Sequence, residues 1–201
     1  IDVRLVGSEM CIRDRLIIFL YAFNANAEEK KIYLAGGCFW CLEEAYQDVD
    51  GVISAISGYS GGHTTDPTYE KISTGKTGHI EALEIIYDDE IINSDSILNI
   101  FFKNIDPFDG NGQFCDKGYQ YQSAIFLNRN INQTLVNKYI SIIESNYEKK
   151  VKTLVLEFDK FYEAEDYHQD FYIKNPIRYN YYKKGCGRVK RLKQLSIVFN
   201  E

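Results

Sequence analysis

The chain has 201 residues, of which 45% are hydrophobic and 26% are charged, and its formal net charge is −6. A chain of this length and composition can bury a core of its own, which excludes a disordered protein, a collagen-like protein and a small disulfide-stapled fold. The negative charge argues against a nucleic-acid-binding protein, because such a protein needs a basic face to replace the counterions of the phosphates.

The first 27 residues have the pattern of a secretory signal peptide. Two arginines precede an unbroken apolar run over residues 16–23, and Ala25-Asn26-Ala27 follows with the small residues of a cleavage site. Eight apolar residues are too few to span a bilayer, which takes about 20. We therefore expect a periplasmic or secreted protein whose mature domain covers residues 28–201, with a buried N-terminal strand as the alternative interpretation of the apolar run.

Residues 6–15 differ in character from the rest of this leader, because they resemble a translated sequencing adapter. If the N-terminal segment is an artefact of that kind, the expected location of the protein changes to the cytoplasm.

Hydrophobic periodicity along the rest of the chain alternates between the period of strands and that of helices. Five segments are expected to be strands: 31–35, 52–59, 80–87, 123–127 and 152–161. Four are expected to be helices: the segment from Cys38 to Gly51, 94–105 with a cap at Ser94 or Asp95, 132–149 and 164–174. The order β-α-β-β-α-β with additions predicts an α+β protein, a ferredoxin-like α/β sandwich in one domain.

Three segments have no such periodicity. Residues 63–79 form a polar, glycine-rich loop, residues 106–120 form a second long loop, and an irregular tail rich in Tyr and Lys follows residue 174. Long loops inside compact domains usually carry function, which directs attention to residues 106–120.

The segment around Cys38 carries the most chemistry. Cys38 is expected at the first turn of a helix, where the backbone N–H groups and the helix dipole lower a thiol pKa and produce a nucleophile at neutral pH. The preceding Gly37 allows a substrate close to the backbone, and Phe39 and Trp40 supply an apolar wall suited to a sulfur-bearing group. Two alternatives remain open for Cys38 and Cys41. One is a structural disulfide. The other is a zinc site, for which the sequence has no second pair of ligands at suitable spacing.

Five other residues gain meaning beside this thiol. Glu81 opens an apolar strand, where burial would raise its carboxyl pKa and suit it to act as a general acid, with a solvated strand edge as the alternative. Asp116 lies in the long loop, with loop capping as its alternative. Core packing is the alternative for Tyr69 and Tyr121, and exposure on a helix surface is the alternative for His168.

The motif Gly37-Cys38-Phe39-Trp40 resembles the active-site signature of the A-type peptide methionine sulfoxide reductases, which act on the S epimer of methionine sulfoxide. Further motifs of that family follow in order and with near-identical gaps, over residues 57–62, 66–69, 77–81, 106–107, 118–123 and 164–169. The resemblance covers residues 31–188, and several ordered motifs are far more specific than any one of them.

The resemblance implies a role for each matching residue. Cys38 is similar to the nucleophile that attacks the sulfoxide sulfur and becomes a sulfenic acid, and Glu81 to the acid that protonates the sulfoxide oxygen. Tyr69 and Tyr121 match tyrosines that hydrogen-bond that oxygen, and Asp116 matches an aspartate that supports the site. The residues expected to bind the substrate are Gly37, Phe39, Trp40 and His168.

A sulfenic acid needs a resolving thiol, and three cysteines are candidates. Cys186, flanked by Gly185 and Gly187 in the tail, matches the C-terminal resolving position of many relatives, and a mobile tail can bring it to Cys38. Cys41 stands where many relatives have Gly and is the second candidate. Cys115 is the third.

The expected partners follow from this chemistry. They are methionine sulfoxide, free or in proteins, and a thioredoxin-like reductant, with no bound cofactor, no metal, no nucleic acid and no stable membrane association, and the protein is expected to be a monomer. The alternative function is a thiol–disulfide oxidoreductase that uses Cys38 and Cys41, and a non-catalytic module that captures sulfoxides is a third hypothesis.

Overall fold

The computed structural model describes residues 29–199, so the segment interpreted as a signal peptide lies outside the described residues. A six-stranded sheet with the strand order β7-β6-β1-β3-β2-β8 forms its centre. The strands of this sheet are β1 (Lys30–Gly36), β2 (Val52–Ser60), β3 (Ile80–Tyr87), β6 (Ser123–Leu127), β7 (Leu154–Glu157) and β8 (Phe161–Glu163). The inner strands β6, β1, β3 and β2 are antiparallel neighbours, which confirms the predicted ferredoxin-like topology.

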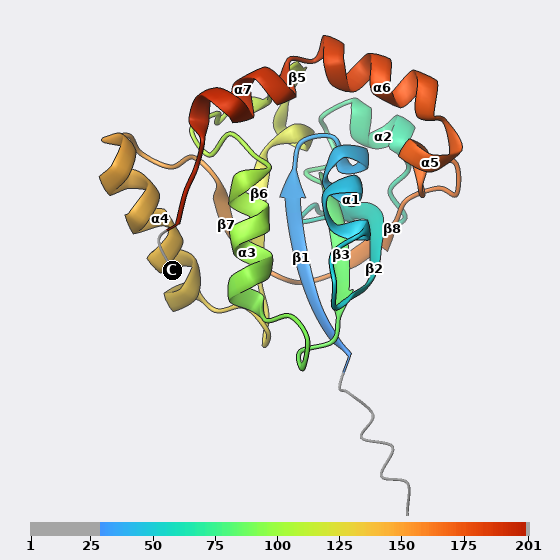
Figure 1. Ribbon diagram of the computed structural model, residues 1–201. Helices are drawn as coiled ribbons and strands as arrows, with labels where there is room; N and C mark the ends of the chain where they lie inside the picture. Colours follow the sequence, from blue (N-terminus) through green and yellow to red (C-terminus); the bar gives the residue numbers. More distant parts are fainter. Residues whose placement is uncertain (1–28, 200–201) are drawn as a thin grey trace, which may run out of the picture.

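Helices surround this sheet on one face and across one end. They are α1 (Phe39–Gln47), α2 (Tyr69–Ser73), α3 (Ser94–Lys103), α4 (Gln133–Tyr147), α5 (Phe171–Lys174), α6 (Pro176–Gly185) and α7 (Arg188–Leu195). In Figure 1, α1 and α3 lie over the same face of the sheet, and α6 and α7 run across the end at which β1 terminates. Among the described residues, no helix combines the length and the apolar character that a bilayer span requires.

The alternation of side chains along β1 divides the core into two. Ile32 and Leu34 belong to a large cluster that fills the space between the sheet and α1, α3 and α4. Tyr33 and Ala35 point to the opposite face, where a smaller cluster forms. Successive residues of a strand point to opposite faces, so one buried strand serves both clusters.

The chain covers the second face of the sheet by crossing it after β7. Residues 152–161 were expected to be one strand, and this prediction is wrong, because β7 pairs with β6 at one edge and β8 pairs with β2 at the other. The ring of Phe158 stacks on Tyr33 with the centroids 3.8 Å apart. Apolar spacing alone does not reveal that a chain leaves one edge of a sheet and joins the opposite edge.

Helix boundaries differ from the expected ones for local reasons. The cap of α3 is Asn93, whose side-chain oxygen accepts a hydrogen bond from Ser96 N, rather than Ser94 or Asp95. The loop predicted over 63–79 contains α2, which Thr68 caps. The helix predicted over 164–174 shortens to α5, since residues 166–170 form turns.

The tail predicted to be irregular is helical. Pro176 begins α6 at a position where its missing N–H costs nothing, and Gly187 separates α6 from α7. Hydrophobic periodicity does not reveal a helix of this kind, because tyrosines rather than aliphatic residues form its buried face.

Candidate active site

The predicted catalytic residues surround one small cavity of about 60 Å³. Its lining consists of Cys38, Phe39, Trp40, Tyr69, Glu81, Asp116, Tyr121 and Tyr182. Seven of these residues were singled out in the sequence. The eighth, Tyr182, was not, because it lies in the segment predicted to be irregular.

The turn between β1 and α1 places Cys38 at the N-cap of the helix. Gly37 adopts a positive φ of 79°, and a Cβ atom at this position would lie 2.5 Å from Gln113 Cβ. Only glycine fits this backbone conformation without displacing its neighbour. The thiol of Cys38 is thereby held at the edge of the cavity and is buried.

The carboxyl of Glu81 lies opposite this helix end. Only 2% of Glu81 is exposed, and its Oε2 accepts a hydrogen bond from Phe39 N at 3.1 Å. Burial raises the pKa of Glu81 well above its usual value, and the Phe39 N–H opposes this only in part. The raised pKa keeps a proton available at neutral pH, as the sequence predicted for a general acid.

The pKa of Cys38 departs from the prediction. Burial raises it well above the usual value, and the neighbouring Cys41 and Glu81 raise it further, while the Tyr182 hydroxyl lowers it. The prediction of a lowered pKa assumed that the helix N-terminus faces the thiol, but the first helical N–H is donated to Glu81 instead. Removal of a thiolate from water therefore outweighs the helix dipole here.

Cys41 is the partner of Cys38 in this thiol pair. Both are free thiols, so the alternative of a structural disulfide between them is wrong. The hydrogen bond with Cys38 lowers the pKa of Cys41 in spite of its burial, and the charge of Arg188 contributes to the same direction. The pair of thiols therefore loses its first proton more readily than a single buried thiol would.

The aromatic wall of the cavity is braced by His168. Trp40 Nε1 donates a hydrogen bond to His168 Nδ1 at 3.2 Å, and because indole only donates, this nitrogen carries no proton. Only 2% of His168 is exposed, and burial lowers its pKa to about 4. The interpretation as a helix-surface histidine is wrong. His168 packs behind Trp40 and Phe39 and does not line the cavity itself.

Three hydroxyl groups gather around the remaining walls. Tyr69 and Tyr121 interact through their hydroxyls, and burial and the charge of Glu81 raise the pKa of both. The hydroxyl of Tyr182 donates to Asp116 Oδ2. The hydroxyl-bearing side chains of Tyr69 and Tyr121 thus line the same cavity as the Glu81 carboxyl and the Cys38 thiol.

The C-terminal cysteine occupies a place that the sequence did not predict. Cys186 forms a disulfide with Cys115, with the sulfur atoms 2.04 Å apart, and caps α6 instead of lying in a mobile tail. Its Sγ lies 3.9 Å from Tyr182 Oη and 4.0 Å from Asp116 Oδ2. The disulfide therefore stands directly behind one wall of the cavity, and the resolving role of Cys186 stays a prediction that requires this bond to open.

One face of α6 connects the two cysteine pairs. Tyr179, Tyr182 and Cys186 follow one another at intervals of three and four residues, and they share a side of the helix. Tyr179 donates to Glu44 Oε2 at 2.7 Å and also contacts the Cys41 thiol. Their helical spacing is the signal by which the sequence could have revealed these tyrosines.

A buried thiol and a buried carboxyl that converge on one aromatic cavity define a thiol-dependent oxidoreductase with a ferredoxin-like fold. The chain belongs to the peptide methionine sulfoxide reductase family, whose model matches residues 30–197. The match covers every wall of the cavity described above.

Individual relatives agree with this assignment. Peptide methionine sulfoxide reductase MsrA 2 of Staphylococcus aureus is 45% identical over 157 residues, covering 77% of this chain and 89% of its own. MsrA 2 of Rhizobium meliloti is 42% identical and covers 88% of each chain. MsrA/MsrB of Vibrio cholerae is also 42% identical, but the matched region is 86% of this chain and only 46% of that longer protein.

Solved structures share the fold as well. Mxr1 from Saccharomyces cerevisiae in reduced form superposes with a TM-score of 0.70 at 30% identity, over 74% of this chain and 87% of its own. Methionine sulfoxide reductase A of Corynebacterium diphtheriae has a TM-score of 0.68 at 31% identity, over 74% of this chain and 76% of its own. The alternative of a general thiol–disulfide oxidoreductase is not favoured by these similarities.

Proposed function

We propose that the protein reduces the S epimer of methionine sulfoxide, free or in proteins, to methionine, and so repairs oxidative damage. The observation that carries this proposal is the convergence of Cys38 and Glu81 on one cavity of about 60 Å³. A sulfoxide is attacked at sulfur only when its oxygen is protonated or strongly hydrogen-bonded, so nucleophile and acid have to reach the same S–O group.

The first step follows from the positions of these groups. The Cys38 sulfur attacks the sulfoxide sulfur while Glu81 transfers its proton to the sulfoxide oxygen, and the proton that the Cys38 thiol loses replaces the one on Glu81. Tyr69 and Tyr121 hydrogen-bond the sulfoxide oxygen. Phe39 and Trp40 contact the S-methyl group. The S–O oxygen is transferred to Cys38, which becomes a sulfenic acid, and methionine leaves.

The size of the cavity agrees with a small reacting group. A volume of about 60 Å³ has room for only a few groups of the size of a water molecule. The methyl sulfoxide end of a side chain fits such a space, and the peptide backbone that carries it stays outside. Free and protein-bound methionine sulfoxide would present the same reacting group to the enzyme.

We propose that Cys41 attacks the sulfenic acid first, before Cys186 takes part. The Cys41 thiol is free and contacts Cys38, whereas the sulfur of Cys186 is already bonded to Cys115. The attack forms a Cys38–Cys41 disulfide and releases water. An external dithiol then has to supply two electrons and two protons to complete the cycle.

We propose a thioredoxin-like protein as that dithiol, with no bound cofactor or metal. The structure of reduced Mxr1 is similar to that of this chain, and Mxr1 has also been solved in complex with Trx2. The leader-like residues 1–27 support a periplasmic or secreted location, where the reductant would receive its electrons across a membrane.

The proposed activity is tested with the purified chain, dithiothreitol and the separated S and R epimers of a blocked methionine sulfoxide. Chromatography follows the appearance of the methionine product. We expect consumption of the S epimer alone. Consumption of the R epimer, or of neither epimer while the thiols titrate as free, contradicts the proposal.

A further inference from the structure

A segment that lines no part of the catalytic cavity lies behind two of its walls. Residues 164–170 follow β8 and precede α5, and none of them belongs to the lining of the cavity. His168 of this segment accepts a hydrogen bond from Trp40 Nε1, and the centroid of its ring lies 4.5 Å from that of Tyr69. Trp40 and Tyr69 belong to different elements, α1 and α2, so the segment contacts both elements from one place. We call residues 164–170 the bracing segment.

The bracing segment is fixed to the sheet through Gln169. The side chain of Gln169 accepts a hydrogen bond from Ser57 N at 3.0 Å and donates one to Ser57 O at 2.9 Å. The same Ser57 oxygen accepts from Ala164 N, so both ends of the segment are joined to one residue of β2. Glu43 of α1 adds a further connection, because it accepts from Asp170 N at 2.7 Å. Both partners lie in regular elements, so the segment is held in place although it forms neither a helix nor a strand itself.

Glu165 carries the connection from the bracing segment to Tyr69. Its Oε1 accepts a hydrogen bond from Tyr69 N at 2.9 Å, and its Oε2 accepts one from Tyr59 Oη at 2.8 Å. Tyr59 is fully buried in β2, so its hydroxyl fixes the carboxylate from the side of the sheet. Burial opposes the ionisation of Glu165, but the bonds from the Tyr69 N–H and the Tyr59 hydroxyl bring its pKa below the usual value. Both carboxylate oxygens are therefore acceptors at neutral pH.

The helix that begins with Tyr69 needs such support because it is short. α2 has five residues, and Tyr69 is the first of them. The first N–H groups of a helix have no partner within it, and a helix of so few residues is unstable by itself in water. Thr68 caps the helix at Lys71 N, whereas the Tyr69 N–H is bound by Glu165, 96 positions away in the chain. The backbone position of Tyr69 thus depends on Glu165.

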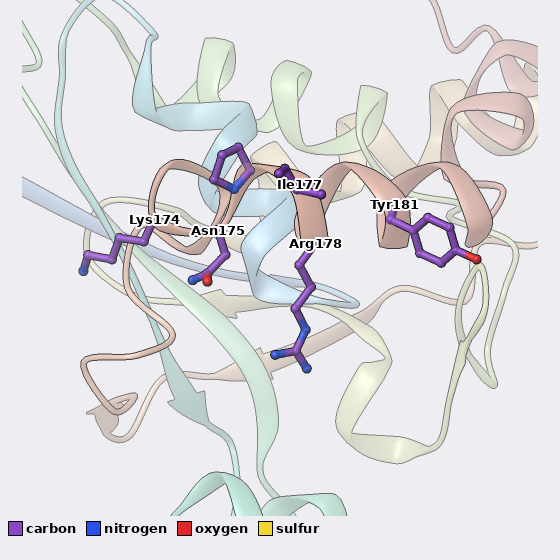
Figure 2. Close-up of a pocket in the computed structure, with 6 residues that line it drawn as sticks. Lys174, Asn175, Ile177, Arg178 and Tyr181 are labelled. Atoms are coloured by element: carbon purple, nitrogen blue, oxygen red, sulfur yellow. The ribbon is translucent and has the colours of Figure 1, made fainter.

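A larger hollow beside α6 takes no part in placing the reacting group. That hollow has a volume of about 590 Å³, and Figure 2 shows Ile177, Arg178 and Tyr181 around it. None of the residues that line the hollow also lines the cavity. A sulfoxide held between Cys38 and Glu81 is therefore oriented by the walls of the small cavity, and turnover should respond to small displacements of those walls.

We propose that Glu165 is a positioning residue, which holds the Tyr69 hydroxyl where it bonds the sulfoxide oxygen. The inference rests on the proposed function, because it explains how one hydroxyl of that function is placed. Glu165 does not line the cavity, and it acts through the backbone of Tyr69. The sulfoxide oxygen gains electron density as its sulfur is attacked, so the bond from Tyr69 strengthens in the transition state. A displaced Tyr69 should therefore lower kcat more than it raises KM.

A double-mutant cycle tests the proposal with the whole chain, dithiothreitol and the S epimer of a blocked methionine sulfoxide. Glu165→Ala should lower kcat about tenfold and change KM by less than about twofold. Tyr69→Phe removes the hydroxyl itself. In that background Glu165→Ala should lower kcat by less than about twofold, because the group that it positions is gone. A role in the stability of the fold alone would give the same factor in both backgrounds.

Two further variants separate geometry from charge and from general disturbance. Glu165→Gln keeps an oxygen for Tyr69 N, and its amide can donate to the Tyr59 hydroxyl, so kcat should return to within about threefold of the unmodified value. Asp166→Ala is the matched control, since it removes a carboxylate from the next residue of the bracing segment, which is exposed. This control should leave kcat and KM unchanged.

A second cycle decides the question if Glu165→Ala does not fold, as judged by circular dichroism. Tyr59→Phe keeps the buried ring and removes only the hydroxyl that fixes Glu165 Oε2. We expect kcat to fall about threefold, and this loss should disappear in the Tyr69→Phe background.

Each contrary result has its own meaning. If the unmodified protein has no turnover with dithiothreitol, the proposed function fails. If turnover is normal but Glu165→Ala keeps its kcat or raises KM alone, the positioning role is wrong and the proposed function stands. An equal loss in both Tyr69 backgrounds, for Glu165→Ala or for Tyr59→Phe, would also overturn the positioning role. The same holds if Glu165→Gln is as slow as Glu165→Ala, or if Asp166→Ala is.

Discussion

The backbone N–H of Phe39 donates to the carboxyl of Glu81, across an N···O distance of 3.1 Å inside the site. The donor belongs to the first residue of α1, and the acceptor belongs to β3. This bond holds the acid beside the nucleophile, because Cys38 directly precedes Phe39 in the chain. It also occupies one carboxyl oxygen and leaves the other to carry the proton that the reaction requires.

Removal of the nucleophile should stop turnover without unfolding the protein. The Cys38→Ser variant keeps the size of the side chain but loses a thiolate that can attack sulfur. We expect no methionine product with dithiothreitol and an unchanged circular dichroism spectrum. Appreciable activity in this variant would show that another residue is the nucleophile.

Replacement of the acid should slow the reaction and change its pH dependence. Glu81→Gln still accepts the Phe39 N–H, but it has no proton to transfer, so we expect kcat to fall by about 10²- to 10⁴-fold. In the unmodified enzyme, activity should fall as pH rises through the raised pKa of Glu81, because the acid is lost there. This decline should be absent from the residual activity of Glu81→Gln.

Glu84→Gln is the control for that variant. Glu84 is a second buried glutamate of β3, three residues farther along, and it accepts a hydrogen bond from Tyr33 rather than from α1. Odd and even positions of a strand point to opposite faces, so Glu84 lies away from the cavity. An equal loss of activity in both variants would contradict the assignment of Glu81.

The hydroxyl of Tyr182 should matter for catalysis, although its ring is enough for packing. It bonds Asp116, and it lowers the pKa of the Cys38 thiol. Tyr182→Phe should therefore reduce kcat severalfold and shift the pH profile of the thiol upward, with a loss of about 1 kcal/mol in the free energy of unfolding. The exposed neighbour Tyr181 provides the control, and Tyr181→Phe should match the unmodified protein in both measurements with dithiothreitol.

Loss of the C-terminal cysteine should affect activity with a thioredoxin-like reductant but not activity with dithiothreitol. Cys186→Ser leaves Cys38 and Cys41 intact, so a single turnover and cycling with dithiothreitol should persist. Cycling with a thioredoxin-like protein should stall, because the surface disulfide cannot form. The amount of methionine in samples quenched at successive times, with each reductant, measures the difference. Full thioredoxin-dependent cycling would assign regeneration to Cys41 or Cys115 alone.

Stability should depend on the protonation of Glu43. This buried carboxyl accepts from Ser57 Oγ and Asp170 N, and burial raises its pKa to about 7. The folded protein thus binds the proton more tightly than the unfolded chain does, so the contribution of this group is complete below about pH 4.5 and is lost as pH rises through 7. Urea unfolding should show Glu43→Gln gaining about 2 kcal/mol relative to the unmodified protein between pH 4.5 and 8. A constant difference across this range would disprove the linkage.

Several features could be predicted because they depend on short segments of chain. The strand at 80–87 matches β3 exactly in its bounds, and the helix after Cys38 follows from apolar spacing over three turns. The motif residues also reach one cavity as the family resemblance implied. Periodicity and motif spacing are local properties, and the sequence contains them completely.

Other features depend on groups that are far apart in the chain. Burial raises the pKa of Cys38 most, followed by Cys41 and then by Glu81 of β3, and the disulfide joins cysteines separated by 71 residues. The burial of His168 depends on its contact with Trp40, 128 residues away. The sequence by itself determined the order of the central strands and helices and the set of reacting residues. Only the tertiary structure decided their protonation and their pairing, because desolvation and disulfide geometry are set by distances that folding alone creates.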